Sequence, residues 1–320
     1  MSKVKNYLSL IKFSHTIFAM PFALIGLFIG FNRMQKLDFN LDIFENQYQD
    51  FNNRGIFMSS RWLYNVFYMN EAILIGFLVI LCMVFARSAA MAFNRYLDRN
   101  FDAKNPRTAI REIPAGAIKA NNALLFTIVS SLLFVVCTFF INKLCFYLSP
   151  VALLVVLGYS YTKRFTPLCH LILGLGLSLA PIGAYLAVTG KFDLLPILFS
   201  FTVLFWVSGF DIIYALQDEE FDKTNKLYSI PAWLGKAKAL RVSELLHVFS
   251  AACVLFAGWF GNFGWLYWIG VVIFIGMLIY QHSIVKPNDL KRVNIAFMTA
   301  NGIASVVFAI FVIADLFFNY

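Results

Sequence analysis

Charged residues are scarce in this 320-residue chain, and their scarcity excludes most soluble folds. Asp, Glu, Lys and Arg make up 13% of the sequence, whereas a soluble globular domain carries about 25%. Apolar residues make up 60% and gather in runs close to the roughly 20 residues that cross a bilayer core. Secreted, fibrous, disordered and soluble globular chains are thereby excluded. The composition predicts an all-α, polytopic membrane helix bundle.

Cysteine and histidine are also too few and too scattered to predict a disulfide framework or a metal centre. The five cysteines stand singly in or beside apolar runs, so we interpret them as small buried hydrophobes. His170, His247 and His282 share no ligand spacing, which argues against zinc or haem. For His15, in the first apolar run, we favour a packed and hydrogen-bonded residue over a part of a substrate pocket.

Nine apolar runs predict about nine transmembrane helices, which we expect to form two four-helix units plus one. They cover residues 13–31, 72–94, 121–141, 146–162, 168–188, 194–213, 241–260, 265–284 and 294–317. The first run is not followed by the small-residue cleavage site of a signal peptide, so we interpret it as a span. A single domain over 1–320 is expected.

An outer insertion at about 33–70 departs from this compact plan. It mixes Asp, Asn and Gln with Trp62, Tyr64, Phe67 and Tyr68. Amphipathic aromatic side chains settle at the membrane interface. We therefore expect a connector that lies along the outer interface, with substrate gating or regulation as the alternative.

Basic residues are distributed unevenly between the two sides that these spans define. With the N-terminus inside, 20 of the 26 Lys and Arg residues fall on the inner side. The six on the outer side are Arg33, Lys36, Arg54, Arg61, Lys143 and Lys191. Because cytoplasmic segments carry the excess of basic residues, we expect a cytoplasmic N-terminus in a bacterial inner membrane. The net charge of +9 thus reflects topology and not nucleic acid binding, which needs one basic, solvent-exposed face.

One face of the second predicted span carries a row of polar residues. Arg87 lies inside an otherwise apolar run, where an ionisable side chain is costly unless it faces a polar interior. At 100° per residue, Asn94 and Asp98 lie within about 20° of Arg87, and Asp102 lies within about 60°. This row is therefore predicted to face the interior of the bundle.

A second acidic set follows the sixth predicted span. Asp218 and Asp222 lie one helical turn apart, and Asp211 lies seven residues before Asp218, which returns it to the same face. One alternative is that both sets are solvated charges at the ends of spans. Two equivalent pairs, the first with Asn94 and Arg87 beside it, favour a functional site over that alternative.

Paired carboxylates at one membrane face suit Mg²⁺ and a diphosphate. Mg²⁺ prefers oxygen ligands and is usually held by one or two carboxylates together with substrate phosphates. We therefore predict Mg²⁺ as the cofactor, with the ligands Asp98, Asp102, Asp218 and Asp222. Basic side chains would meet the remaining phosphate charge, and the nearby candidates are Arg107, Arg111, Lys163 and Arg164. A deep apolar bundle beside this site suits a lipid tail.

These motifs resemble those of the UbiA-type intramembrane prenyltransferases. The resemblance rests on Asn94-x-x-x-Asp98-x-x-x-Asp102 with Arg107-Thr108, Arg111 and Pro114, and on Asp211-x-x-Tyr214-Ala-x-x-Asp218-x-x-x-Asp222. The segment from Tyr159 through Lys163 and Arg164 to His170 and Gly174 looks like the branch that acts on 4-hydroxybenzoate. Two positions depart from the pattern: Arg95 stands where many members have Asp, and Tyr228 replaces a Lys before Ser229.

The resemblance implies Mg²⁺-dependent transfer of a polyprenyl group from a polyprenyl diphosphate to an aromatic acid within the lipid bilayer. It implies that the four paired aspartates and Asn94 hold Mg²⁺ against the diphosphate. Asp211 is expected to polarise or deprotonate the phenol, and Arg164 to bind either the carboxylate of the acceptor or the diphosphate. The expected substrate-binding residues are Arg87, Asn94, Arg107, Arg111, Lys163 and Tyr214.

Three other interpretations fit parts of this pattern. A dihydroxynaphthoate, in menaquinone biosynthesis, is an alternative acceptor to 4-hydroxybenzoate. A multi-span transporter also has repeated helix units, but transporters tend to place their site near the midplane on broken helices. A membrane phosphotransferase for alcohol-linked nucleotides also uses Asp pairs, but its Asp-Gly-x-x-Ala-Arg motif is absent from this sequence.

Overall fold

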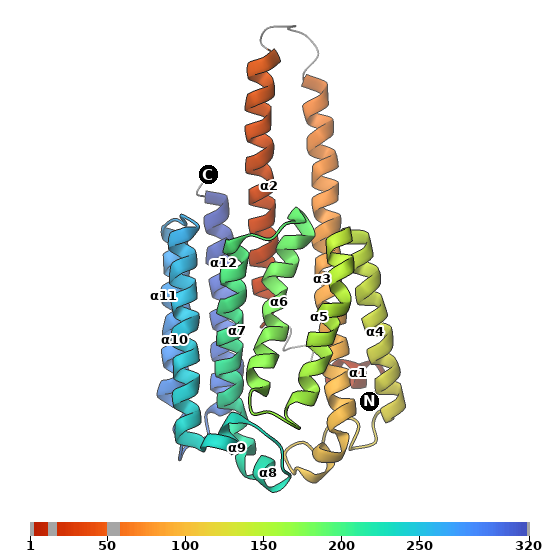
Figure 1. Cartoon of the computed structure of the whole chain (residues 1–320), viewed down its shortest axis with the longest axis vertical. Helices are drawn as coiled ribbons and strands as arrows, with labels where there is room; N and C mark the ends of the chain where they lie inside the picture. The colour runs from red at the N-terminus through yellow and green to blue at the C-terminus, as the bar shows by residue number, and fades with distance from the viewer. Residues whose placement is uncertain (1–2, 12–17, 50–57, 319–320) are drawn as a thin grey trace.

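Long helices joined by short connections make up the fold (Figure 1). The computed structural model describes residues 3–11, 18–49 and 58–318, and their side chains in 6–11, 18–35 and 70–318. Within these ranges the regular secondary structure is helical, and one isolated bridge joins Lys286 and Asp289. The expected all-α fold is confirmed.

Eight helices in the described part of the chain are long and apolar enough to cross a membrane. The first is the Asn70–Lys104 part of α3 (Met58–Lys104). The other seven contain α4 (Ala120–Ile141), α5 (Lys143–Thr162), α6 (Cys169–Thr189), α7 (Leu194–Ala215), α10 (Lys236–Phe260), α11 (Trp265–Ile284) and α12 (Asn301–Phe318). These eight correspond to the second to ninth predicted spans. Residues 13–17 of the first predicted span, 13–31, lie outside the described residues, and His15 is one of them. The rest of it forms the start of α2 (Met20–Gln49), so a bundle of about nine spans is confirmed.

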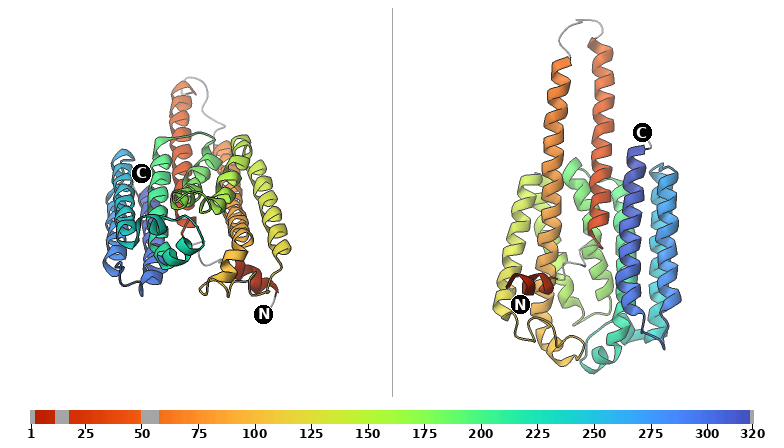
Figure 2. Two further views of the ribbon diagram at one scale, coloured as in Figure 1. Left: turned by 60° about the horizontal axis from the view of Figure 1, so that its bottom comes forward. Right: turned by 180° about the vertical axis from the view of Figure 1, so that it is seen from behind.

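Short helices lie at the end of the bundle that we predict to face the cytoplasm (Figure 2). They are α1 (Lys3–Leu10), the 3-10 turn η2 (Leu216–Asp218), α8 (Glu219–Thr224) and α9 (Ile230–Leu234). A fifth short element, the π-helix η3 (Ile295–Ala300), leads directly into α12. We call the end of the bundle that carries α8 and α9 the inner end.

Helix ends follow from the local sequence. Asn142 separates α4 from α5 because its backbone is extended while its side chain accepts a hydrogen bond from the Cys145 amide at 2.8 Å. Gly190 ends α6 in the left-handed region, at φ 62°, which glycine adopts without steric cost. Ser229 caps α9 by accepting from the Ala232 amide, and Pro231 occupies the first turn.

The insertion at 33–70 is helical where it is described. Helix α2 runs to Gln49 and α3 begins at Met58, and both continue beyond the other helices, away from the bundle (Figure 1). Neither 32–49 nor 58–69 contains proline or glycine, so the helices of the membrane core continue without an interruption. The expected connector along the outer interface is therefore wrong, and residues 50–57 lie outside the described residues.

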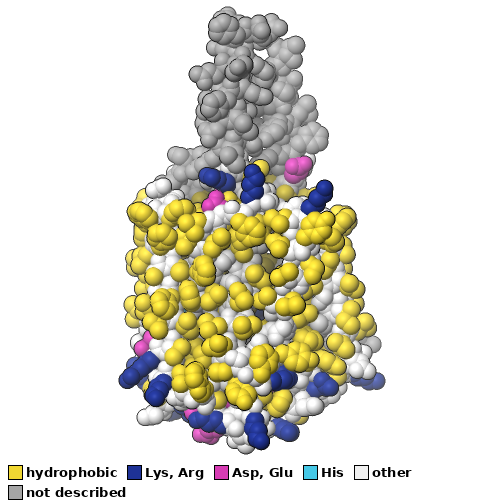
Figure 3. All heavy atoms as spheres, viewed as in Figure 1, with side chains coloured by type: hydrophobic (Ala, Val, Ile, Leu, Met, Phe, Trp, Pro, Cys, Tyr) yellow, Lys and Arg dark blue, Asp and Glu magenta, His cyan; other side chains and the backbone are white. Residues whose placement is uncertain are grey.

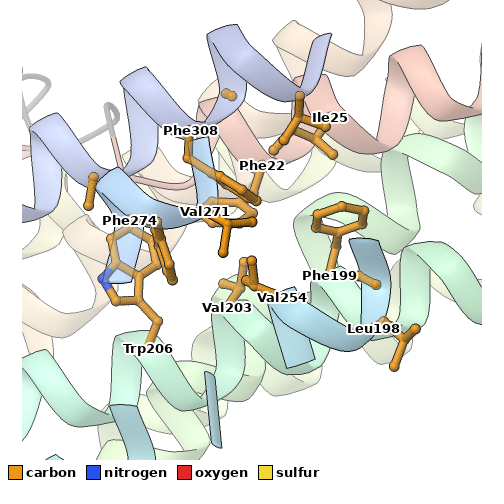
Figure 4. Close-up of a cluster of buried hydrophobic side chains, with 14 of the residues drawn as sticks. Phe22, Ile25, Leu198, Phe199, Val203, Trp206, Val254, Val271, Phe274 and Phe308 are labelled. Atoms are coloured by element: carbon orange, nitrogen blue, oxygen red, sulfur yellow. The ribbon is translucent and has the colours of Figure 1, made fainter. Parts of the chain in front are cut away.

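The surface and the interior agree with a membrane setting. On the face of the molecule that Figure 3 shows, apolar side chains cover the middle of the bundle, and Lys and Arg side chains gather at its two ends. Inside, a cluster of buried apolar side chains joins α2, α7, α10, α11 and α12 (Figure 4). Its centre is Trp206, whose ring centroid lies 5.3 Å from that of Phe22 and 5.9 Å from that of Phe274. This packing holds α7, which carries the second acidic set at its inner end.

Candidate active site

A cavity of about 290 Å³ opens among the inner ends of α3, α5, α6 and α7. It brings together the two acidic sets, which are far apart in the sequence. Eleven of the twelve predicted site residues line it: Arg87, Asn94, Asp98, Asp102, Arg107, Arg111, Lys163, Asp211, Tyr214, Asp218 and Asp222. The twelfth, Arg164, lies behind Asp98 and contacts it directly.

Asp98 is the most strongly paired carboxylate of the site. Its side chain is 2% exposed and contacts Lys163 Nζ at 2.6 Å and Arg164 at 2.9 Å. The Asn94 amide donates at 3.2 Å to Asp98 Oδ2, the oxygen that Lys163 also contacts. Because Asn94 and Asp98 are one turn apart on α3, the predicted polar row exists and faces the cavity.

Arg164 is held firmly at the α3 side of the cavity. Besides Asp98, its guanidinium donates to the backbone carbonyls of Ser160 at 2.7 Å and Leu97 at 3.1 Å. Its charge also lies 5.6 Å from the ring centroid of Phe101. These contacts tie Arg164 to the α3 side of the cavity, next to Asp98.

Asp102 is only half satisfied by the protein. Arg111 donates to Oδ1 at 2.6 Å. The other oxygen, Oδ2, is buried, and no described residue donates a hydrogen bond to it. A buried carboxylate oxygen without a partner is costly, and it fits a position where a cation binds.

The second acidic pair lies at the inner end of α7. Arg107 contacts Asp218 through two guanidinium nitrogens and donates to the Tyr214 hydroxyl at 2.8 Å. Burial lowers the pKa of Arg107, but the Asp218 carboxylate and the Tyr214 hydroxyl outweigh it and raise that pKa above its ordinary value. Asp222 accepts a hydrogen bond from the Ser229 hydroxyl at 2.8 Å. The loop after α3 is thus joined to α7 and η2, and α8 is joined to the start of α9.

The predicted magnesium ligands form two pairs and not one cluster. Among the described residues, no three His, Cys, Asp or Glu side chains converge to hold a metal ion. A Mg²⁺ ion held by one or two carboxylates and substrate phosphates needs no larger group. With the unpartnered oxygen of Asp102, this arrangement fits Mg²⁺ bound together with a diphosphate.

Two arginines on α3 have no carboxylate partner among the described residues. Arg87 lies two turns, or about 10 Å, deeper in the membrane than Asn94. Its Nε and that of Arg95 are buried without hydrogen-bond partners in the described structure, and both side chains line the cavity. The sequence analysis noted Arg95 only as a departure from a family pattern and did not predict it as a site residue. Its position at the edge of the polar row could have indicated that it faces the cavity. Two unpaired guanidinium groups make the cavity attractive to anions.

Asp211 pairs with a histidine that sequence reasoning left without a role. His170 Nδ1 lies 2.6 Å from Asp211 Oδ2, and both residues line the cavity. The sequence offered no local signal, because these residues are 41 positions apart. The other two described histidines pair with one another, with His247 Nδ1 2.9 Å from His282 Nε2, and neither lines the cavity.

The deeper wall of the cavity is apolar and aromatic. Its side chains are Phe18, Leu173, Leu177, Val207, Phe210 and Phe297. Phe297, on the π-helix η3, packs its ring on Tyr214 with centroids 4.3 Å apart. Polar groups at one end and apolar groups at the other suit an amphipathic substrate.

Comparisons with known proteins agree with this geometry. The model of the UbiA prenyltransferase family matches residues 63–303. A 4-hydroxybenzoate octaprenyltransferase of Tolumonas auensis is 30% identical over 70% of this chain and 78% of its own length. The enzyme of the same name from Nitrosospira multiformis is 30% identical over 72% of this chain and 79% of its own.

Solved structures share the fold over nearly the whole chain. The apo structure of a UbiA homologue from Aeropyrum pernix K1 superposes with a TM-score of 0.70 at 25% identity, covering 95% of this chain and 98% of the other. The structure of a UbiA homologue from Archaeoglobus fulgidus bound to DMAPP and Mg²⁺ superposes with a TM-score of 0.69 at 18% identity. The match covers 98% of this chain and 99% of the other. At that identity the second likeness concerns the fold alone. The chain therefore belongs to the UbiA prenyltransferase family, and it is a prenyltransferase and not a transporter.

Proposed function

We propose that this chain transfers a polyprenyl group from a polyprenyl diphosphate to 4-hydroxybenzoate, with Mg²⁺ as cofactor. The observation that carries the proposal is the cavity, which has acidic and basic side chains at one end and apolar side chains at the other. The two relatives described above are named 4-hydroxybenzoate octaprenyltransferases. A structural neighbour binds DMAPP and Mg²⁺.

The donor diphosphate binds between the two acid pairs. Asp98 and Asp102 on α3, and Asp218 and Asp222 beyond α7, are the proposed Mg²⁺ ligands, with Asn94 beside the first pair. When bound, Mg²⁺ stabilises the negative charge that develops on the leaving diphosphate. The apolar wall of the cavity holds the start of the prenyl chain.

Basic side chains exchange partners when the donor binds. Lys163, Arg107 and Arg111 each contact one of the proposed ligand carboxylates. A carboxylate that held Mg²⁺ would no longer need its cationic partner, and the freed basic side chain would then be available to the diphosphate. Until the substrate arrives, these ion pairs balance the charges of the carboxylates and of the basic side chains against each other.

The aromatic acid binds deeper, beside Arg87 and Asp211. Arg87 has an unpartnered Nε, so we assign the acceptor carboxylate to it, whereas Arg164 stays with Asp98 on the donor side. The Asp211 carboxylate accepts the phenol proton as general base. These assignments give the two negative groups of the substrates separate guanidinium partners.

The bonds and protons of the proposed reaction balance with Asp211 and the leaving diphosphate or water as proton acceptors. The bond between the diphosphate oxygen and C1 of the prenyl group breaks, and its electron pair leaves with the diphosphate. A ring carbon ortho to the phenol oxygen forms the new bond to C1. Asp211 takes the phenol proton during this attack and returns a proton to the same oxygen afterwards. The hydrogen of the attacked carbon leaves as a proton to the diphosphate or to water.

The site faces the cytoplasm of a bacterial cell in this proposal. The loops beside the cavity belong to the side that holds 20 of the 26 basic residues. The two relatives described above come from bacteria. A water-soluble acid then enters from the cytoplasm, while the prenyl donor enters from the bilayer.

Product analysis tests the proposal. Membranes that contain the full-length protein receive one labelled polyprenyl diphosphate and a panel of acids with 4-hydroxybenzoate and a dihydroxynaphthoate. Mass spectrometry should detect prenylated 4-hydroxybenzoate, and membranes with Asp218→Asn should lack it. A prenylated naphthoate alone would replace the proposed acceptor. If none of the acids in the panel is prenylated, the proposed function is overturned.

A further inference from the structure

His170 is a buried cavity residue that the proposed chemistry does not use. It lies in the first turn of α6, and its side chain is 4% exposed. Burying an imidazole is costly unless both ring nitrogens are hydrogen-bonded. Both nitrogens of His170 have partners, and these partners lie on two different parts of the site.

The hydrogen bonds of the ring assign its tautomer. The backbone N–H of Ile230 points to His170 Nε2 at 3.3 Å. A backbone N–H can only donate, so Nε2 carries a lone pair and the ring proton is on Nδ1. Nδ1 therefore donates to Asp211 Oδ2 at 2.6 Å. Among the described residues, none donates to the other oxygen, Oδ1, which is left for a substrate.

The backbone that orients the ring also supports the donor side. Tyr228, two residues before Ile230, donates from its amide to the Lys163 carbonyl at 2.7 Å. Ser229, between them, donates to the Asp222 carboxylate. One short segment therefore holds both a proposed magnesium ligand and the acceptor nitrogen of His170. The imidazole ring bridges this segment to Asp211.

Close contact between α6 and α7 brings the ring to its partner. A Cβ on Gly174, one turn after His170, would lie 2.3 Å from Ser208 Oγ and 2.4 Å from the Leu204 carbonyl oxygen. The Ser208 hydroxyl also lies 3.1 Å from the His170 carbonyl oxygen. Glycine at this position thus allows the two helices to touch.

From these contacts we propose that His170 is a positioning residue that acts through Asp211. Its Nδ1–H holds the carboxylate in one orientation, with Oδ1 presented to the phenol of the aromatic acceptor. The proposal rests on the function given above, because it needs Asp211 to be the group that receives the phenol proton. A carboxylate that is fixed before the substrate binds loses less freedom in the transition state.

Asparagine and leucine at position 170 separate positioning from packing. Asparagine carries an amide nitrogen one bond beyond Cγ, as histidine carries Nδ1, so it can keep the hydrogen bond to Asp211. We expect His170→Leu to lower kcat by about 10- to 100-fold with little change in the KM for the prenyl diphosphate. His170→Asn should recover most of the wild-type kcat. The matched control is His282→Asn, at a histidine outside the cavity, and this variant should keep the wild-type kcat.

A double-mutant cycle with Asp211→Asn gives the second measurement. If His170 acts through Asp211, His170→Leu should cause no further loss of kcat in the Asp211→Asn protein. The proposal would be overturned if His170→Leu lowered kcat equally in the wild-type and Asp211→Asn proteins. It would also be overturned if His170→Asn were as slow as His170→Leu, because the ring would then only contribute packing. Failure of the wild-type chain to prenylate any aromatic acid would overturn both the function and this role.

Discussion

Arg107 Nε donates to Asp218 Oδ1 at 3.1 Å, and a second nitrogen of the same guanidinium contacts Oδ2. This two-point ion pair joins the loop after α3 to the inner end of α7, across 111 positions of sequence. The Tyr214 hydroxyl accepts a third hydrogen bond from the same group. Because these partners raise the pKa of Arg107, its charge is present at any pH at which the protein is assayed.

Replacing Arg107 by lysine should weaken donor binding. Lysine keeps the charge but lacks the planar fork that matches a carboxylate or a phosphate. Losing hydrogen bonds to a charged group costs about 1.5–3 kcal/mol, which is roughly a 10- to 100-fold rise in the KM for the prenyl diphosphate. Steady-state kinetics with each substrate varied in turn checks this. An increase confined to the KM of the aromatic acid would place Arg107 on the acceptor side.

Removing divalent metal should abolish turnover, and Mg²⁺ should restore it. Each of the substitutions Asp98→Asn, Asp102→Asn, Asp218→Asn and Asp222→Asn should lower the rate by at least roughly 100-fold, the scale of losing one key electrostatic stabiliser. Initial rates in membranes treated with a chelator and then titrated with Mg²⁺ provide the measurement. Near-normal activity after Asp98→Asn and Asp218→Asn are combined would disprove the two-pair site.

Conservative changes at two arginines should separate the acceptor from the donor. We expect Arg87→Lys to raise the KM of the aromatic acid and Arg164→Lys to raise that of the prenyl diphosphate, because loss of uniform binding appears in KM. The physical reason is that Arg87 Nε is unpartnered, whereas Arg164 contacts Asp98. The reverse result would assign the carboxylate to Arg164.

The membrane orientation is testable with two exposed lysines. Lys191 lies between α6 and α7 at the outer end, and Lys104 ends α3 near the cavity. In a cysteine-free variant, Lys191→Cys should react with an impermeant thiol reagent added outside intact cells. Lys104→Cys should react only after the membrane is permeabilised. The opposite pattern would turn the active site to the other face.

Two glycines of α6 should respond differently to alanine. At Gly174 the added Cβ would meet the Leu204 carbonyl oxygen and Ser208 Oγ, so the helices must separate, at a cost of about 1–3 kcal/mol. At Gly183 nothing lies within 4 Å, and alanine favours the helix. Thermal unfolding in detergent should show a lower Tm for Gly174→Ala and an unchanged or higher Tm for Gly183→Ala. Equal values would contradict the close contact of α6 with α7.

Short-range patterns made much of the site predictable. The row from Arg87 to Asp102 follows from the period of one continuous helix, and α3 is continuous over that range. The same rule placed Asp211 near Asp218, because only one short 3-10 turn, η2, interrupts the path between them. The membrane fold followed from the length of the apolar runs.

Contacts between distant segments were beyond reach of these rules. The pairing of His170 with Asp211 depends on how closely α6 approaches α7, and no local period encodes that distance. Likewise, Arg164 was predicted near both acid pairs, but its bonds to the Leu97 and Ser160 carbonyls depend on the packing of α5 on α3. The insertion was misjudged because polar composition says little about a helix that continues from a stable core.

The π-helix η3 makes the number of residues before α12 matter. Phe297 in this turn packs on Tyr214 at the cavity, and Asn301 just after it accepts hydrogen bonds from Trp206 and Gln281 in the core. A π turn holds one residue more than the α turn it replaces. Deleting one residue, such as Met298, would rotate one side of the turn by about 100° against the other. Either Phe297 would leave Tyr214 at the cavity, or Asn301 would leave Trp206 and Gln281 in the core. The length of this segment is therefore constrained even where its side chains are not.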